Sequence, residues 1–198
     1  MNCIVCGRNL TKSEKHHLVI GLTCERCIPR GKNVPIQVRL ANEPEDRQFV
    51  LRFLSDLFSE TEFIEFGKWY HVQEMEQLVA NTEKGECIGL AVYATEPEDR
   101  TLLMTLLTIN VDESFFRQGV ASAFLKEVKK NATRVGVSKI RVPISNDDLV
   151  SYVFYHRHGF RLSGIDIDLC VKRHGSEIED FWGLPCKDEF YLVCNLGD

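Results

Sequence analysis

The stretch of sequence that decides the fold is Ile109-Asn110-Val111-Asp112-Glu113-Ser114-Phe115-Phe116-Arg117-Gln118-Gly119-Val120-Ala121-Ser122. An apolar strand end, a short polar turn and the beginning of a helix follow one another in it. The first backbone N–H groups of a helix have no intrahelical partners and carry a partial positive charge. Gly119 lets the backbone approach a ligand closely, and the small Ala121 and Ser122 leave room for it. The stretch therefore predicts a binding site for a pyrophosphate group.

A second informative stretch is Asp148-Leu149-Val150-Ser151-Tyr152-Val153-Phe154-Tyr155-His156-Arg157-His158-Gly159-Phe160. Together the two stretches resemble the GNAT superfamily of acetyl-CoA-dependent N-acyltransferases, and the resemblance covers residues 34–198. The family pattern Arg/Gln-x-x-Gly-x-Gly/Ala falls on Phe116–Ala121, with Phe116 at the first position. The family pattern Asn-x-x-Ala-x-x-x-Tyr, followed by Gly-Phe, fits at Tyr155, Gly159 and Phe160. Ser151 stands in place of Ala, and either Asp148 or Asn146 fills the Asn position.

The resemblance implies an α/β (α+β) fold with a mixed, mostly antiparallel central sheet of about seven strands. In this family the fourth and fifth strands splay apart, and the pantetheine arm of the cofactor lies between them. Pro143 cannot donate to a sheet ladder, so it fits such a splay, although an edge strand or a bulge would explain it equally well. The residues that the resemblance assigns to acetyl-CoA binding are Ile109, Asn110, Val111, Phe116, Arg117, Gln118, Gly119, Val120, Ala121, Ser122, Asn146, Asp148 and Ser151.

The activity that the resemblance implies is transfer of an acetyl group from acetyl-CoA to an amine by direct attack. By its position in the motif, Tyr155 matches the family's general acid. A phenol with an ordinary pKa of about 10 is protonated at neutral pH and can therefore donate a proton. A tyrosine that only fills the core is the alternative. The backbone N–H of Val111 or a neighbour is expected to stabilise the oxyanion. The position of the family's basic Glu falls on Thr105, which cannot act as a base. The remaining candidates for a base are Glu96, Glu98, Asp99 and a chain of water molecules.

Hydrophobic periodicity predicts the other elements of residues 34–198. Asn42 is expected to cap the first helix, with Glu45 completing a capping box. A shorter helical or irregular stretch rich in aromatic residues is expected over residues 63–70. Turns are expected at Lys84-Gly85 and at Glu96-Pro97-Glu98-Asp99. The expected strands are residues 36–40, 75–81, 87–94, 102–111, 140–144, 165–171 and 190–194, and the expected helices begin after Asn42, Gly119 and Asp147 or Asp148.

Residues 1–33 are predicted to be a separate zinc ribbon. Cys3 and Cys6 form one Cys-x-x-Cys pair, and Cys24 and Cys27 form a second, so four thiolates are available for one tetrahedral zinc ion. The segment has too few large apolar residues to form a core, and metal binding would supply the missing folding energy. Iron is the second choice of metal. Residues 1–33 carry a net charge of +4, and the remainder of the chain carries −9. This difference supports the division into two parts and allows a protein or nucleic-acid partner for the ribbon.

The composition narrows the remaining possibilities. With 198 residues, 44% of them hydrophobic and a net charge of −5, the chain is expected to fold rather than to remain disordered. We expect a cytoplasmic protein, because neither a signal peptide nor a segment able to cross a membrane is recognisable. Besides the enzyme, a non-catalytic domain that senses acyl-CoA or presents the zinc ribbon to a partner remains possible, because Phe116, Asp148 and Thr105 depart from the family pattern.

Overall fold

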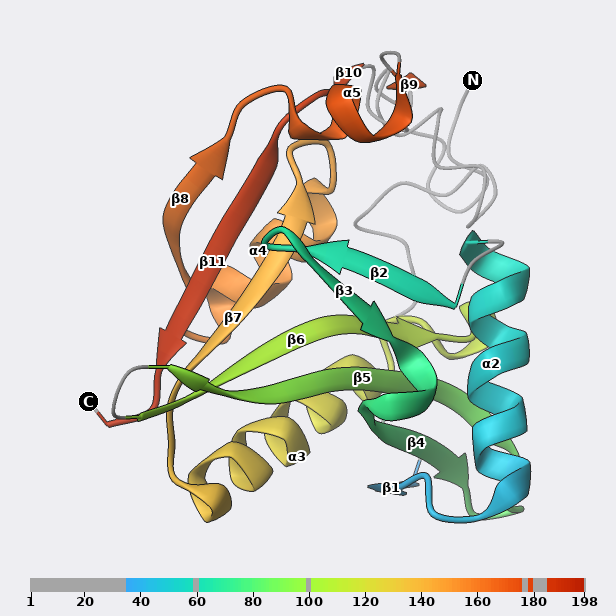
Figure 1. The fold of residues 1–198 in the computed structure, drawn as a ribbon. Helices are drawn as coiled ribbons and strands as arrows, with labels where there is room; N and C mark the ends of the chain where they lie inside the picture. The colour runs from blue at the N-terminus through green and yellow to red at the C-terminus, as the bar shows by residue number, and fades with distance from the viewer. Residues whose placement is uncertain (1–34, 59–60, 99–100, 176–177, 180–184, 198) are drawn as a thin grey trace, which may run out of the picture. The chain divides into compact units, whose positions relative to one another are not determined.

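The computed structural model describes residues 35–58, 61–98, 101–175, 178–179 and 185–197. These residues form two compact units, one of residues 35–143 with 193–197 and the other of residues 144–192. A mixed seven-stranded sheet has the strand order β1-β4-β5-β6-β7-β11-β8, which confirms the predicted α/β fold and the expected number of strands (Figure 1). Two short two-stranded sheets, β2–β3 and β9–β10, accompany it.

Four antiparallel strands build the sheet of the larger unit. They are β1 (Ile36–Leu40), β4 (Glu76–Thr82), β5 (Cys87–Glu98) and β6 (Thr101–Val111). The turn expected at Lys84-Gly85 is confirmed, because Gly85 has a φ of 82° and its N–H donates to the carbonyl of Thr82. The turn expected at Glu96–Asp99 is wrong, since β5 continues to Glu98. Beyond Tyr93, β5 pairs with β6 and has left β4 behind, so Pro97 lies where β5 has a ladder on one side only.

Helix α2 (Pro44–Phe58) covers one face of this sheet. Its Val50 and Leu54 are fully buried against Leu90 and Val92 of β5. The predicted cap is wrong by one residue, because the carbonyl of Glu43 accepts the first intrahelical bonds. The carboxylate of Asp46, rather than that of Glu45, reaches back to the Glu43 N–H at 3.3 Å.

An antiparallel hairpin of β2 (Glu62–Glu65) and β3 (Lys68–His71) replaces the expected helical or irregular stretch. Phe63, Phe66 and Tyr70 are spaced like one face of a helix, so their pattern does not indicate a strand. The turn residues Phe66 and Gly67 have φ values of 53° and 71°, and two successive positive values are typical of a two-residue hairpin turn. A short 3₁₀ turn, η2 (Val72–Glu74), then leads into β4.

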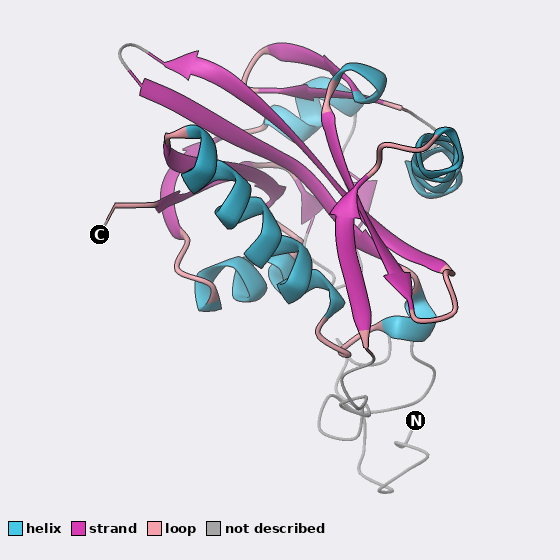
Figure 2. Cartoon of the chain, turned by 90° about the horizontal axis from the view of Figure 1, so that it is seen from below, coloured by secondary structure: helices cyan, strands magenta, loops and turns pink. Residues whose placement is uncertain are grey.

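Helix α3 (Val120–Val135) lies on the opposite face of the sheet from α2, as Figure 2 shows. Its buried side chains include Phe124, Leu125 and Val128, as the helical periodicity predicted. The contact between α3 and the sheet is close at Gly89, where a β-carbon would lie 3.2 Å from the Phe124 ring and 2.6 Å from the Asn110 carbonyl. Strand β7 (Val137–Ser145) follows α3 and runs parallel to β6.

The unit of residues 144–192 contains α4 (Leu149–Arg157), β8 (Arg161–Asp166), α5 (Leu169–His174), β9 (Ile178–Glu179), β10 (Pro185–Cys186) and most of β11 (Glu189–Asn195). Asp148 caps α4, and Gly159 closes it with a φ of 91°, as predicted. The strand expected over residues 165–171 is wrong beyond Asp166, because β8 covers Arg161–Asp166 and only residues 165 and 166 are shared. Asp168 adopts a φ of 57°, which ends the extended chain and starts α5 at Leu169. None of the described helices is long and apolar enough to cross a membrane.

Candidate active site

The parallel ladder between β6 and β7 is short. It begins at Leu102↔Val137 and ends at Thr105↔Arg141, whereas β6 continues to Val111 and β7 to Ser145. The two strands therefore pair at one end only, as the expected splay requires. Pro143 lies in β7 beyond the last pair, is buried, and has no N–H with which to extend the ladder.

A β-bulge in β6 provides the local reason for the divergence. In the register with β5, Thr108 lies opposite Val92 and Leu106 lies opposite Tyr93, so Leu107 is an extra residue on β6. Bulges bend the strand that carries them and increase its twist. Leu107 is only 7% exposed and belongs to the core beneath α2. The uniformly apolar run of β6 gave no sign of this bulge, so the sequence analysis missed it.

The turn that follows β6 is fixed by its own side chains. Asp112 accepts a hydrogen bond at 2.9 Å from the N–H of Ser114, and its own N–H donates to the carbonyl of Ile88. The side-chain amide of Gln118 donates to the carbonyl of Ser114 at 2.9 Å. Gln118 therefore holds the turn in shape, which is a role that the sequence pattern did not reveal.

The helix that begins at this turn has the geometry of an anion site. Gly119 occupies the N-cap of α3 with a φ of 86°, and Arg117 just before it has a φ of 62°. The first intrahelical bond is made by the N–H of Ala123 to the carbonyl of Gly119, so the N–H groups of Val120, Ala121 and Ser122 precede it. The side chains of Phe116 and Arg117 are exposed. The continuous segment Ile109–Ser122, with all its predicted cofactor-binding residues, thus leads from the diverging strand to a free helix start.

Side chains from four strands meet where the β6–β7 ladder ends, and we call this set the apex cluster: Lys68, Tyr70, Glu96, Thr105 and Arg141. Glu96 forms an ion pair with Lys68 and accepts a hydrogen bond from the Tyr70 hydroxyl at 3.2 Å. Arg141 lies 3.7 Å from the same carboxylate. Its Nε–H donates to the Thr105 hydroxyl at 2.8 Å.

The apex cluster bears on the choice of a general base. Thr105 is fully buried at the position of the family's Glu, and its hydroxyl is bound to Arg141. Of the other candidates, Glu96 is surrounded by hydrogen-bond donors and Glu98 forms an ion pair with Lys139. Asp99 lies outside the described residues. No carboxylate of the described residues at this place is therefore free of a cationic partner.

The predicted residues of the smaller unit are close together around the start of α4. Asp148 accepts a hydrogen bond from the N–H of Ser151 at 2.9 Å, as a helix cap does. Asn146 accepts bonds from the N–H groups of Lys187 and Asp188 and donates to the carbonyl of Pro185. Because both ends of its side-chain amide are occupied, Asn146 holds the segment before β11 in place.

Tyr155 is buried within α4, with 5% of its surface exposed, and its ring packs against Phe154 and Phe160. Burial, with a smaller contribution from the charge of Asp148, raises the pKa of Tyr155 far above its ordinary value. Among the described residues, its hydroxyl has no hydrogen-bond partner. It is thus a phenol that stays protonated at neutral pH.

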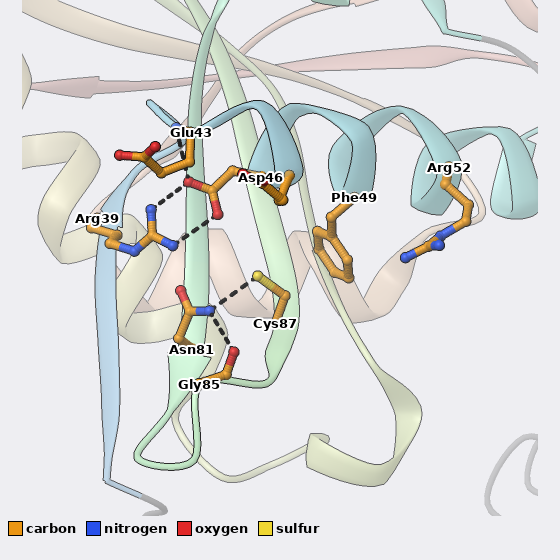
Figure 3. Close-up of a pocket in the computed structure, with 9 residues that line it drawn as sticks. Arg39, Glu43, Asp46, Phe49, Arg52, Asn81, Gly85 and Cys87 are labelled. Carbon is orange, nitrogen blue, oxygen red and sulfur yellow. Dashed lines mark hydrogen bonds and ion pairs between the residues drawn. The ribbon is translucent and has the colours of Figure 1, made fainter.

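An open cavity of about 480 Å³ lies elsewhere in the larger unit, at the start of α2 (Figure 3). Its wall includes Arg39, whose guanidinium pairs with Asp46 and lowers the pKa of that carboxyl, chiefly through their hydrogen bonds. The thiol of Cys87 accepts a hydrogen bond from the side chain of Asn81 at 3.1 Å, and burial raises its pKa. None of the predicted cofactor-binding residues lines this cavity.

The predicted metal ligands Cys3, Cys6, Cys24 and Cys27 lie outside the described residues. Within the part of the chain that the structure describes, no cluster of His, Cys, Asp and Glu side chains could hold a metal ion. The described cysteines, Cys87, Cys170, Cys186 and Cys194, are free thiols.

Comparison with known proteins agrees with this geometry. Residues 44–160 match the acetyltransferase (GNAT) family, and the chain belongs to that family. The uncharacterized N-acetyltransferase YvbK of Bacillus subtilis is 22% identical over 163 residues, which are 81% of this chain and 97% of YvbK. The uncharacterized protein YdhI of the same organism is 23% identical over 96 residues, 48% of this chain, and the match spans only about half (56%) of YdhI. A GNAT family acetyltransferase from Elizabethkingia anophelis, solved with acetyl-CoA bound, has 21% identity and a TM-score of 0.59, covering 83% of this chain and 99% of that one.

Proposed function

We propose that the protein transfers the acetyl group of acetyl-CoA to the amine of an acceptor molecule. The observation that carries the proposal is the divergence of β6 and β7 after Thr105↔Arg141, combined with the free start of α3 at the end of the same strand. In this arrangement the N–H groups of Gly119–Ser122 bind the pyrophosphate of acetyl-CoA. The pantetheine arm then extends along residues 106–111 of β6 toward the point where the strands meet.

The reaction needs few protein groups. The neutral amine nitrogen attacks the thioester carbon, a C–N bond forms, and the carbonyl oxygen becomes an oxyanion that a backbone N–H of β6 beside the thioester stabilises. The C–S bond then breaks, and Tyr155 donates its proton to the leaving thiolate. The proton lost by the amine passes to water. With a pKa raised by burial, the phenol of Tyr155 is protonated at neutral pH and can act only as a proton donor, not as a base.

The zinc ribbon stays a prediction about Cys3, Cys6, Cys24 and Cys27, and we propose that it has a structural role. Segment 1–33 contains no aromatic residue that could stack on a nucleic-acid base, and this favours packing or partner binding over base recognition.

Two measurements on the full chain test the function. Calorimetric titration with acetyl-CoA is expected to give stoichiometric binding, and a thiol-release assay over a panel of amines is expected to show acceptor-dependent release of CoA. Binding without release under any acceptor would instead support an acyl-CoA sensor. Absence of binding would overturn both readings.

A further inference from the structure

Arg141 is held in an unusual way for a side chain with five N–H donors. Only 21% of the side chain is exposed, and its guanidinium lies 3.7 Å from the centroid of the Phe66 ring. The hydrogen bond from Nε to the buried hydroxyl of Thr105 fixes the direction of the group. Arg141 is therefore oriented from one face and one edge before any ligand arrives.

The other edge of the guanidinium is not used. Among the described residues, Nη1 and Nη2 make no hydrogen bond, because the nearest carboxylate oxygen, on Glu96, is 3.7 Å from Nη2. Glu96 is itself held by Lys68 and by the Tyr70 hydroxyl, so it compensates the charge of Arg141 without occupying its donors. Two parallel terminal donors on a rigid guanidinium match the two oxygens of a carboxylate.

The position of Arg141 in the sheet indicates whether its ligand belongs to the acceptor or to acetyl-CoA. Arg141 belongs to the last pair of the β6–β7 ladder, whereas the phosphate site at Gly119 follows the far end of β6. The six residues from Leu106 to Val111 separate the two places by about 20 Å at the rise of an extended strand. A group at Arg141 thus comes from the acceptor rather than from the phosphates of acetyl-CoA.

We infer that Arg141 binds a carboxylate of the acceptor, so that the acceptor is an amino acid or another amine that carries a carboxylate. This inference rests on the proposed acetyl transfer. The carboxylate forms two parallel hydrogen bonds with Nη1 and Nη2, and this contact directs the amine of the acceptor toward the thioester. Phe66 and Thr105 act as positioning residues through Arg141.

The test compares matched pairs of amino acids and their amides as acceptors in the thiol-release assay. The parent protein is expected to prefer the acid by about ten- to hundredfold in kcat/KM, the usual range for a charged hydrogen-bonded contact. Thr105→Val keeps the volume but removes the acceptor of the Nε–H, and it is expected to raise the KM of the acid several-fold and leave that of the amide unchanged. Arg141→Met is expected to abolish the preference, and Arg141→Lys to restore only part of it.

Lys139→Met is the matched control, because Lys139 lies two residues away on β7 and pairs with Glu98 outside the apex cluster. It is expected to retain the preference, and all variants are expected to bind acetyl-CoA as the parent does. Release that is equal for acid and amide, or that favours the amide, overturns the inference and leaves the acetyltransferase intact. A preference that survives Arg141→Met also overturns it. No release with any acceptor, despite acetyl-CoA binding, overturns the proposed function and the inference with it.

Discussion

The residue on which the proposed chemistry depends most is Tyr155. Removing its hydroxyl in Tyr155→Phe takes the proton donor from the leaving thiolate while preserving the ring packing against Phe154 and Phe160. We expect kcat to fall by about a hundredfold or more, the usual effect of losing a general acid, with an unchanged KM for acetyl-CoA. Steady-state kinetics of thiol release measures both quantities.

Tyr152→Phe provides the control for this substitution, since Tyr152 lies on the same helix and packs its ring against His156 and Phe190. It should keep the parental kcat. The pH profile adds a second check, because a raised pKa means that the proton stays on Tyr155 as the pH increases. Turnover of the parent should therefore not decline between about pH 7 and 9 through loss of this proton. A Tyr155→Phe variant as fast as the parent would exclude the acid role.

Among the helices and strands, the start of α3 provides the most direct test of the proposed phosphate site. The substitution Gly119→Glu forces a β-carbon into a φ of 86° and places a carboxylate where the phosphates are expected. We expect calorimetry to detect no binding of acetyl-CoA and thermal unfolding to reveal a loss of about 1–3 kcal/mol from the backbone strain.

A substitution at the C-terminal end of the same helix tests the effect of backbone strain without placing a charge at the proposed phosphate site. Gly136 has a φ of 82°, and a β-carbon there would meet nothing within 4 Å. Gly136→Glu should therefore cost similar stability and leave acetyl-CoA binding unchanged. Equal affinity of Gly119→Glu and the parent would contradict the phosphate site at this helix start.

The success of the sequence analysis differed between elements for a physical reason. Helix α3 was predictable because its apolar residues repeat with the helical period after Gly119, and strand β6 because a run rich in apolar residues ends at the turn before Gly119. The hairpin of β2 and β3 was not, because Phe63, Phe66 and Tyr70 fit a helical spacing and the turn at Phe66 needs a positive φ that its residue type disfavours. Tertiary pairing between the two short strands decided the outcome.

In the candidate site, too, the features set by local sequence could be predicted and those set by strand pairing could not. The turn and the helix start follow from local sequence, so their places in the chain could be predicted. The bulge at Leu107 and the bond from Arg141 to Thr105 depend on strand register, because Thr105 and Arg141 are far apart in the chain. An isolated Arg in an alternating strand gives no signal of its own, and only the sheet brings it to the place where the ladder ends.

For the molecule as a whole, the remaining question is what the first 33 residues contribute. Their four paired cysteines predict about one zinc ion per chain, measured by elemental analysis of the full-length protein. The double substitution Cys24→Ser and Cys27→Ser leaves only two thiolates and should remove the metal, whereas Cys87→Ser with Cys186→Ser should retain it, because both of these are free thiols of the described chain. Because the proposed phosphate site lies within residues 109–122, chelation is expected to leave acetyl-CoA affinity unchanged. Zinc that persists without Cys24 and Cys27 would contradict the ribbon, and iron in its place would give visible absorption that the two substitutions remove.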